Sequence, residues 1–461
     1  MNNNDIICAP ATIPGTGAIS VIRVSGKGSL ELADKVISLR KGSIAQSKGY
    51  TLHFGSIFAS DGSLLDEVIV SVFRAPNSYT GEDGVEISCH SSKYIVSETI
   101  GLLCEKGCRM AGPGEFTQRA YLNGKMDLAQ AEAVADVIAA DSKAALRVAQ
   151  SQLRGEYSAA FKELRDALVR LSALVELELD FSEEEVEFAS REMIIGLAES
   201  AIAKMSRLRD SYRVGNALKN GVPVAIVGAP NVGKSTLLNA LLGEDRAITS
   251  DIPGTTRDTV EESIVIEGVR YRFIDTAGIR ETEQMIERLG IERSLAKIRD
   301  AAIVICLLDA TKKDESEQML SKVESLIDAE NQKIIVVANK SDLNGHVKEE
   351  LSGLSEGAIS ISALRKEGLR ELEKAIVKCG FADTDEHVIV TSARHYNALS
   401  SAVESLRAVV RAVREGISEE LLAEDLRAAI CDINSIFAST SDAITSDEVL
   451  GEVFGKFCIG K

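Results

Sequence analysis

The stretch GAPNVGKS, residues 228–235, decides the fold of the central part of the chain. It is a complete GxxxxGKS/T loop that directly follows the apolar run VPVAIV and directly precedes the helical run TLLNALLG. The backbone N–H groups of such a loop, together with the next helix N-terminus, can surround phosphates. Lys234 can reach the β and γ phosphates, and Ser235 can ligate Mg²⁺. The stretch therefore predicts a P-loop nucleotide-binding domain.

Four near-continuous apolar runs alternate with helical segments around this loop. They are VPVAIVG, YRFIDTAG, AAIVICLLDA and QKIIVVANKSD. Strands of a parallel sheet have this composition because helices cover both faces of the sheet. The pattern predicts a Ras-like, doubly wound α/β domain over residues 219–380.

The stretch NKSD, residues 339–342, selects the base of the nucleotide. Asp342 can accept both N–H donors on the Watson–Crick edge of guanine, whereas adenine would leave that carboxylate without a partner. The predicted nucleotide is therefore GTP. SISAL, 360–364, resembles the loop that backs the guanine in this class, and DTAG, 275–278, is the expected sensor of the γ-phosphate, with Asp275 near Mg²⁺.

The sequence departs from small GTPases at the position that orients the attacking water. A glutamine usually follows the glycine of DTAG, but here the residue is Ile279, which cannot hold a water. Glu287 is the candidate for that task, although a glutamate on a charged helix is commonly a surface residue. No arginine finger is obvious, so Asn231 and the carbonyls of 250–256 could hold a monovalent cation between the phosphates.

Composition limits the class of protein. A chain of 461 residues is too long for one hydrophobic core, so we expect two to four domains. The net charge of −18 has the wrong sign for binding nucleic acid through bulk charge, and any such partner must meet a local basic patch. The eight cysteines form no CxxC pair, and the sequence shows neither a leader nor an apolar run of membrane-spanning length. These features predict a cytoplasmic protein with no membrane segment.

The character of the sequence changes three times along the chain. Short apolar runs with Gly and Pro turns indicate an α/β domain first. From Asp127, which forms a predicted capping box with Gln130, apolar residues repeat at helical spacing. The simplest architecture is a helical domain with an α/β domain inserted in it. The predicted segments are 1–120 (N-terminal domain), 121–218 and 381–461 (helical domain) and 219–380 (GTPase domain).

Several stretches together resemble the MnmE (TrmE) family of tRNA-modifying GTPases. They are GAPNVGKSTLLNALL, SDIPGTTRD, DTAGIRET, RLGIERS, FCIGK and PGEFTQRAYLNGKMDLAQAEAVADVI. The resemblance covers essentially the whole chain in the same order. It implies an enzyme that hydrolyses GTP and, with an FAD-containing partner of the MnmG type, adds an aminomethyl or carboxymethylaminomethyl group to the wobble uridine of certain tRNAs. It further implies a tetrahydrofolate one-carbon donor, a homodimer and a heterotetramer with that partner.

The resemblance also implies the residues that contact GTP and metal ions. The GTP contacts are Asn231, Val232, Gly233, Lys234, Ser235, Thr236, Ser250, Asp251, Ile252, Pro253, Gly254, Thr255, Thr256, Asp275, Thr276, Ala277, Gly278, Asn339, Lys340, Ser341, Asp342, Ser362, Ala363 and Leu364. Mg²⁺ is assigned to Ser235 and Thr256, and K⁺ to Asn231, Ser250, Ile252 and Thr255. Glu287 takes the hydrolytic role.

The N-terminal domain is implied to bind the folate and to dimerise. The family's contacts to a formyl-folate correspond to Arg23, Glu82, Lys125 and Lys461, whose chemistry suits a pterin with a glutamate tail. One departure is visible, because Ser91 and Ser92 stand where the family often has two glycines. A polar side chain there could crowd the neighbouring loop.

The ending KFCIGK, residues 456–461, has three interpretations. Cys458 could pack at the end of a helix, or it could be prenylated, although Gly460 and Lys461 do not fit that motif. The third is a catalytic thiol that the tail carries to the folate site.

Two other functions share parts of this pattern. A GTPase switch that acts in ribosome assembly without modification chemistry would share the GTPase domain, but it requires neither a folate domain nor a terminal thiol. A folate-binding structural protein with a vestigial GTPase domain is disfavoured by the intact phosphate, magnesium and guanine motifs.

Overall fold

The chain divides into two compact units. The computed structural model describes residues 5–180, 191–243, 262–274, 297–343, 357–380, 388–415, 419–437, 447–455, 457 and 460. The first unit comprises Met1–Ile138, Gln152–Met205 and Asn397–Lys461, and the second comprises Ala139–Ser151 and Ser206–Tyr396. Among the described residues, no helix is both long enough and apolar enough to cross a membrane.

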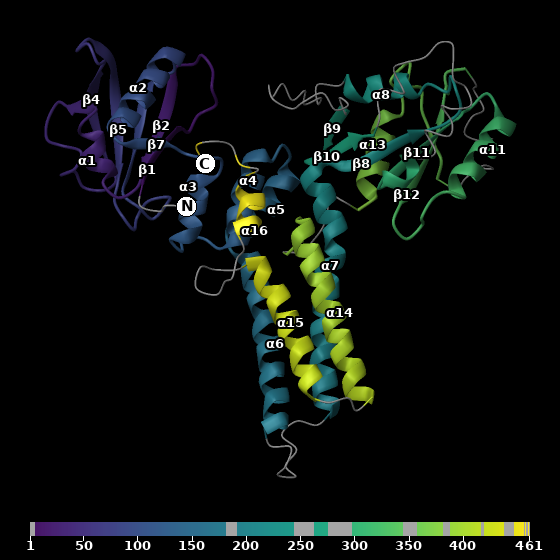
Figure 1. The fold of residues 1–461 in the computed structure, drawn as a ribbon. Helices are drawn as coiled ribbons and strands as arrows, with labels where there is room; N and C mark the ends of the chain where they lie inside the picture. The colour runs from purple at the N-terminus through teal and green to yellow at the C-terminus, as the bar shows by residue number, and fades with distance from the viewer. Residues whose placement is uncertain are drawn as a thin grey trace. The chain divides into compact units, whose positions relative to one another are not determined.

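The first unit contains a seven-stranded sheet in the order β3-β4-β5-β6-β2-β1-β7 (Figure 1). Its strands are β1 (Ile6–Pro10), β2 (Ile19–Ser25), β3 (Ile37–Leu39), β4 (Thr51–Phe58), β5 (Leu64–Phe73), β6 (Gly84–His90) and β7 (Cys108–Met110). All neighbours are antiparallel except β1 and β7. Side chains alternate along β5, where Val68 and Val70 are buried and Ile69 is exposed. One face of the sheet therefore carries a core.

Helices α1 (Ser29–Ala33) and α2 (Lys93–Glu105) cover that buried face. Leu30 of α1 and Leu103 of α2 share a hydrophobic cluster with strand residues such as Ile22 and Ile87. The α/β fold predicted for the N-terminal segment is confirmed. Helix α3 (Glu115–Leu122) follows β7.

Long helices complete the first unit. They are α4 (Leu128–Ala139), α6 (Glu156–Asp180), α15 (Glu419–Phe437) and α16 (Asp447–Phe454), with parts of α7 (Arg191–Asn220) and α14 (Ala393–Glu415). Figure 1 shows α6 beside α15, and Arg165 Nε donates to Asn434 Oδ1 across that pair at 3.0 Å. The predicted capping box is confirmed, because the Asp127 amide donates to Gln130 Oε1 and the Gln130 amide to Asp127 Oδ1.

Helix α16 packs with helices that lie far from it in the sequence. Phe454 and Phe457 share a cluster with Tyr121 of α3 and Leu128 of α4. Gly114 precedes α3 with φ +66°, and a Cβ there would lie 2.7 Å from the Phe454 carbonyl oxygen. A glycine is needed for this close approach. Phe454 and Phe457 are thus held against α3.

The second unit contains a six-stranded sheet in the order β13-β12-β11-β8-β10-β9. Its strands are β8 (Val222–Val227), β9 (Glu262–Ile266), β10 (Val269–Phe273), β11 (Ile303–Asp309), β12 (Lys333–Asn339) and β13 (Ile359–Ser360). Every neighbouring pair is parallel except β9 and β10. The near-continuous apolar runs therefore form the parallel strands that the sequence predicts.

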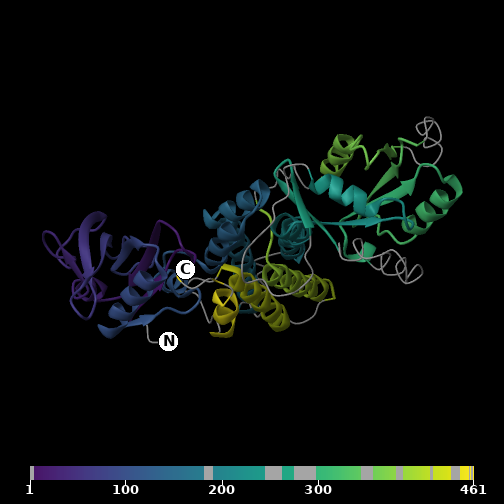
Figure 2. The ribbon, with the colours of Figure 1, turned by 90° about the horizontal axis from the view of Figure 1, so that it is seen from above.

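Helices lie on both faces of this sheet (Figures 1 and 2). Ile305 of β11 faces a core that includes α8 (Lys234–Leu242) and α13 (Leu369–Lys378). Its neighbour Cys306 faces a second core, with α11 (Lys313–Glu324) and the 3₁₀ helix η1 (Lys297–Asp300). Burial on both faces explains why β11 is apolar throughout. The predicted doubly wound fold is confirmed.

Helix α5 (Lys143–Leu153) contributes to the core of the second unit. Ala144 and Val148 belong to the same cluster as the buried residues of β8 to β10. The Ala144 amide donates to the carbonyl of Gly268 at 3.0 Å, in the turn between β9 and β10. Arg270 and Asp141 form an ion pair beside that turn. This segment is separated in the sequence from the rest of the second unit.

Candidate functional site

The phosphate loop of the second unit joins β8 to α8 through two glycines that have no room for a side chain. A Cβ on Gly228 would lie 2.3 Å from the Leu307 carbonyl oxygen, and one on Gly233 would lie 2.4 Å from Asn339 Nδ2. Gly233 also has φ +100°, a conformation that favours glycine. Asn231, between them, has φ +59°. The loop thus approaches two neighbouring strands closely with its backbone.

Lys234 folds back over this loop. Its Nζ donates to the carbonyl oxygens of Gly228 and Ala229, both at 2.9 Å. Burial lowers the pKa of Lys234. Ser235 and Thr236 follow in the first turn of α8. The amino group is therefore held beside the backbone that the GTP phosphates are predicted to contact.

Asn339, the last residue of β12, connects the phosphate loop to the 362–364 loop. Its Nδ2 donates to the Val232 carbonyl at 2.8 Å, and its Oδ1 accepts from the Ala363 amide at 2.9 Å. The side chain is buried, so both bonds form away from water. Asn339 therefore positions the two loops by a pair of buried hydrogen bonds.

Asp342 and Ser362 meet at the same sheet edge. Ser362 Oγ donates to Asp342 Oδ1 at 2.7 Å, and this hydrogen bond lowers the pKa of the Asp342 carboxyl. The amide of Ser341 donates to the Ile361 carbonyl at 3.1 Å. Leu364 is exposed. The structure thus brings together three segments that the sequence assigns to GTP: the phosphate loop, 339–342 and 362–364.

One partner in this site is not among the residues predicted from the sequence. Lys340 has φ +69°, and its Nζ lies 2.7 Å from Asp309 Oδ2. Burial acts to raise the pKa of Asp309, but hydrogen bonds from Lys340 and Thr311 outweigh it and the net shift is downward. Asp309 ends the apolar run of β11, at the same sheet edge as Asn339. A carboxylate at the end of a parallel strand was the available signal.

Other predicted site residues lie outside the described part of the chain. They are Ser250, Asp251, Ile252, Pro253, Gly254, Thr255, Thr256, Asp275, Thr276, Ala277, Gly278, Glu287, Cys458 and Lys461.

In the first unit, three of the predicted folate residues come together around the turn 79–82. The Arg23 guanidinium carbon lies 5.1 Å from the centre of the Tyr79 ring. Lys125 packs against Gly81, and its Nζ donates to the Pro76 carbonyl at 3.0 Å. Glu82 belongs to the turn itself. The turn 79–82, which carries Glu82, thus contacts two cationic residues, Arg23 and Lys125, that lie far from it in the sequence.

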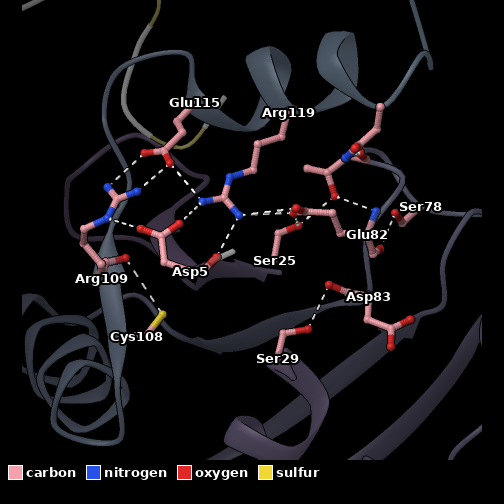
Figure 3. A network of polar contacts seen from close by, with 12 residues as sticks. Asp5, Ser25, Ser29, Ser78, Glu82, Asp83, Cys108, Arg109, Glu115 and Arg119 are labelled. Carbon is pink, nitrogen blue, oxygen red and sulfur yellow. Dashed lines mark hydrogen bonds and ion pairs between the residues drawn. The ribbon is translucent and has the colours of Figure 1, made fainter. Parts of the chain in front are cut away.

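The Glu82 carboxylate is held by residues that the sequence analysis did not single out (Figure 3). Ser25 Oγ donates to Glu82 Oε2 at 2.8 Å and lies 2.7 Å from Thr80 Oγ1. Nη1 of Arg119 lies 3.4 Å from each carboxylate oxygen. PGEFTQRA pointed to this segment as a family motif, but no local pattern connects Arg119 to a residue 37 positions earlier.

Arg23 connects the folate residues to the end of the chain. It pairs with Glu86 on the neighbouring strand at 2.8 Å, and its Nη1 lies 3.5 Å from the Gly460 carbonyl oxygen. Gly460 has φ +100°, and a Cβ there would lie 2.1 Å from the Pro10 carbonyl oxygen. Gly460, two positions after Cys458 in the sequence, therefore lies against β1.

Ser91 is accommodated by hydrogen bonds. Its Oγ lies 2.9 Å from Ser20 Oγ and donates to the Gly15 carbonyl at 3.1 Å. The position that a Cβ on Gly17 would take lies 3.7 Å from Ser91 Oγ, an ordinary contact distance. The hydroxyl is therefore bonded to the neighbouring loop.

Comparison with known proteins adds independent findings. The sequence-family model of the MnmE helical domain matches residues 128–458, and that of the GTP-binding protein TrmE N-terminus matches residues 6–125. The tRNA modification GTPase MnmE of Bacteroides thetaiotaomicron is 48% identical over 472 aligned residues, covering 100% of both chains. That of Flavobacterium johnsoniae is 46% identical, also with 100% of both chains covered.

A solved structure matches part of the chain. The G domain of the T. maritima FeoB iron transporter is 28% identical, over 34% of this chain and 98% of that one, with a TM-score of 0.27. The full-length relatives and the two family models establish the family. The chain belongs to the MnmE family of tRNA modification GTPases.

Proposed function

We propose that this tRNA modification GTPase works with an FAD-containing partner of the MnmG type. Together they add an aminomethyl or carboxymethylaminomethyl group to C5 of the wobble uridine of certain tRNAs. A tetrahydrofolate derivative supplies the one-carbon unit. The observation that carries this proposal is the convergence of Arg23, Glu82 and Lys125 around one turn, with Gly460 of the tail beside Arg23.

The chemistry of this cluster suits a folate. A carboxylate accepts N–H donors, and a pterin presents such donors on one edge of its ring. Arg23 and Lys125 can pair with the carboxylates of the glutamate tail, as can Lys461. Because the cluster contains both signs of charge, it matches a ligand that donates at one end and is anionic at the other.

The terminal thiol completes the proposed modification site. Gly460 lies against β1, and Cys458 is only two residues earlier in the sequence. A thiolate is a strong nucleophile, and nearby cations favour it over the thiol. Arg23, Lys125 and Lys461 are candidates to supply that charge. We assign Cys458 to work on the one-carbon unit or on the uridine.

GTP hydrolysis is assigned to the second unit. The proposed GTP contacts are the phosphate loop, 250–256, 275–278, 339–342 and 362–364. Mg²⁺ would be held by Ser235 and Thr256, and K⁺ by Asn231, Ser250, Ile252 and Thr255. Held there, the two ions would neutralise charge that develops on the phosphates. Glu287 would position the attacking water.

The assembly and its location are also proposals. We infer a homodimer formed through the N-terminal domain, and a heterotetramer with the MnmG-type partner. The net charge of −18 means that tRNA must meet a local basic surface, on this chain or on the partner. The scattered cysteines support a cytoplasmic location.

Mass spectrometry of wobble nucleosides tests the proposed function. Cells that lack this protein should lack the modified uridine, and the wild-type gene should restore it. Glu82→Gln should restore it poorly, whereas Glu67→Gln, at an exposed position on β5, should restore it fully. If the nucleosides are unchanged and ribosomal subunits accumulate instead, the ribosome-assembly switch replaces this proposal.

A further inference from the structure

A buried guanidinium lies between Glu82 and two other carboxylates (Figure 3). The Arg119 side chain is 4% exposed. Its Nη2 donates to Asp5 Oδ1 at 2.6 Å and to Glu115 Oε1 at 3.1 Å. Its Nη1 donates to the Asp5 carbonyl at 2.9 Å and lies 3.4 Å from both Glu82 oxygens. Nη2, which is bonded to two carboxylates, is thus the anchored end of the guanidinium, whereas Nη1 is the end that faces Glu82.

The two carboxylates that hold the anchored end are also bonded to Arg109. Arg109 donates to Asp5 at 2.8 Å and to Glu115 at 2.7 Å, and the Gly112 amide donates to Glu115 at 2.8 Å. The hydrogen bond from Arg109 is the main cause of a lowered Asp5 pKa. Burial acts to raise the pKa of Glu115, but the bonds from Arg109 and Gly112 outweigh it. Both carboxylates are therefore charged at neutral pH.

This cluster leaves Glu82 with capacity to bind a donor. Two guanidinium groups face three carboxylates, so the cluster carries one excess negative charge. Among the described residues, the Glu82 carboxylate accepts one short hydrogen bond, from Ser25 at 2.8 Å, while its contacts with Arg119 are long. A carboxylate has about four lone-pair sites. The remaining ones can accept N–H groups from a ligand.

We propose that Arg119 is a positioning residue, which orients the Glu82 carboxylate for a ligand that presents two neighbouring N–H donors. The 2-amino and N3 groups of a pterin form such an edge, so the inference rests on the proposed folate function. A planar guanidinium suits this role because its two ends hold fixed directions. Lysine offers only a point charge, which cannot hold Asp5 and Glu82 in the same geometry.

A purely structural role for Arg119 predicts a different behaviour towards ligands. If Arg119 only ties Asp5 to α3, its loss should weaken all folates equally. If it orients Glu82, its loss should specifically erase recognition of the 2-amino group. The probes are 5-formyltetrahydrofolate and an analogue in which a methyl group replaces that amino group, with binding to the full chain measured by calorimetry.

The wild type should prefer 5-formyltetrahydrofolate by about 10-fold or more, the scale of a lost hydrogen bond to a charged acceptor. Arg119→Lys should reduce this preference to about threefold or less. Asp5→Asn leaves Arg119 in place but weakens its anchor, so it should reduce the preference by a smaller factor. Arg40→Gln is the matched control, because it removes an arginine of the same unit that pairs with Glu67 and not with this cluster, and it should keep the preference.

One further variant, Glu82→Gln, separates the possible failures. The melting curve of each variant reports folding, and Asp5→Asn carries the test if Arg119→Lys is unstable. If folded Arg119→Lys and Asp5→Asn keep the wild-type preference for 5-formyltetrahydrofolate while Glu82→Gln loses it, Arg119 is not a positioning residue. If Glu82→Gln binds both probes as the wild type does, the folate assignment itself fails and the inference falls with it.

Discussion

The two candidate sites of this protein are built in opposite ways. In the second unit, Asn339 ends a parallel strand and Gly228 and Ser362 follow parallel strands, so the order of the strands brings them to one sheet edge. In the first unit, Arg23 contacts Tyr79 and Arg119 contacts Glu82, so the site is made by side-chain contacts between segments that are far apart in the chain. A site made by strand ends can be recognised from one local motif. A site made by side-chain contacts requires the folded structure.

The largest expected effect separates the two sites completely. Cys458→Ser should reduce the modified wobble uridine to an undetectable level, because a serine hydroxyl does not ionise at neutral pH as a thiol does. GTP binding and potassium-stimulated hydrolysis should persist, since both belong to the second unit. Nucleoside mass spectrometry and a phosphate-release assay measure the two activities. Modification at the wild-type level would return Cys458 to a packing role.

The next effect tests the second unit alone. Glu287→Ala should lower kcat for GTP hydrolysis by about 10²-fold, the usual scale for a group that positions the attacking water. GTP affinity should stay nearly unchanged. Glu315→Ala is a matched control, because Glu315 is an exposed glutamate on α11 that pairs only with Lys312 among the described residues. A rate within about twofold of wild type would make Glu287 a surface residue.

A smaller effect concerns the monovalent cation. Hydrolysis should be several-fold faster in KCl than in NaCl, because the site proposed from the carbonyls of 250–256 and the Asn231 side chain would hold the larger ion. Asn231→Ala should remove most of that difference. Steady-state rates at equal ionic strength measure it. Equal rates of the wild type in the two salts contradict the potassium assignment.

The smallest effect concerns the pH dependence of guanine binding. The Ser362 hydroxyl holds the pKa of Asp342 below its usual value, so the carboxylate that we propose binds guanine stays ionised to a lower pH. Ser362→Ala removes this bond and raises the pKa, so GTP affinity should decline at a higher pH than in the wild type. Titration with a fluorescent GTP analogue from about pH 5 to pH 3 measures the shift, because an aspartate ordinarily titrates near pH 4. Superimposable profiles contradict it.

Sequence patterns predict most of the second unit because each of its strands carries a recognisable pattern in its own residues. Alternate residues of β11 face two different cores, which requires an apolar side chain at every position and makes the strand visible. The capping box at Asp127 is local in the same sense. The pairing of Lys340 with Asp309 is not, because it joins the ends of two strands.

The first unit shows what a single sequence cannot supply. The folate residues were assigned by family resemblance, since nothing in their spacing requires them to meet. Arg119 could not be assigned a role, because its contacts with Asp5 and Glu82 depend on how the sheet and α3 pack. Long-range ion pairs of this kind have no periodicity in the sequence.

The position of α5 has a consequence for the order in which the protein folds during synthesis. The ribosome makes Ala144 and Val148 long before it makes the β9–β10 turn against which this segment packs. The core of the second unit includes residues of α5 and of β9 and β10. Helix α5 therefore cannot pack until β9 and β10 have been made, and the long chain segment between them closes into a loop late in folding. The nascent GTPase core is therefore incomplete without a segment that precedes it, and an excised 219–380 fragment would lack that part of its core.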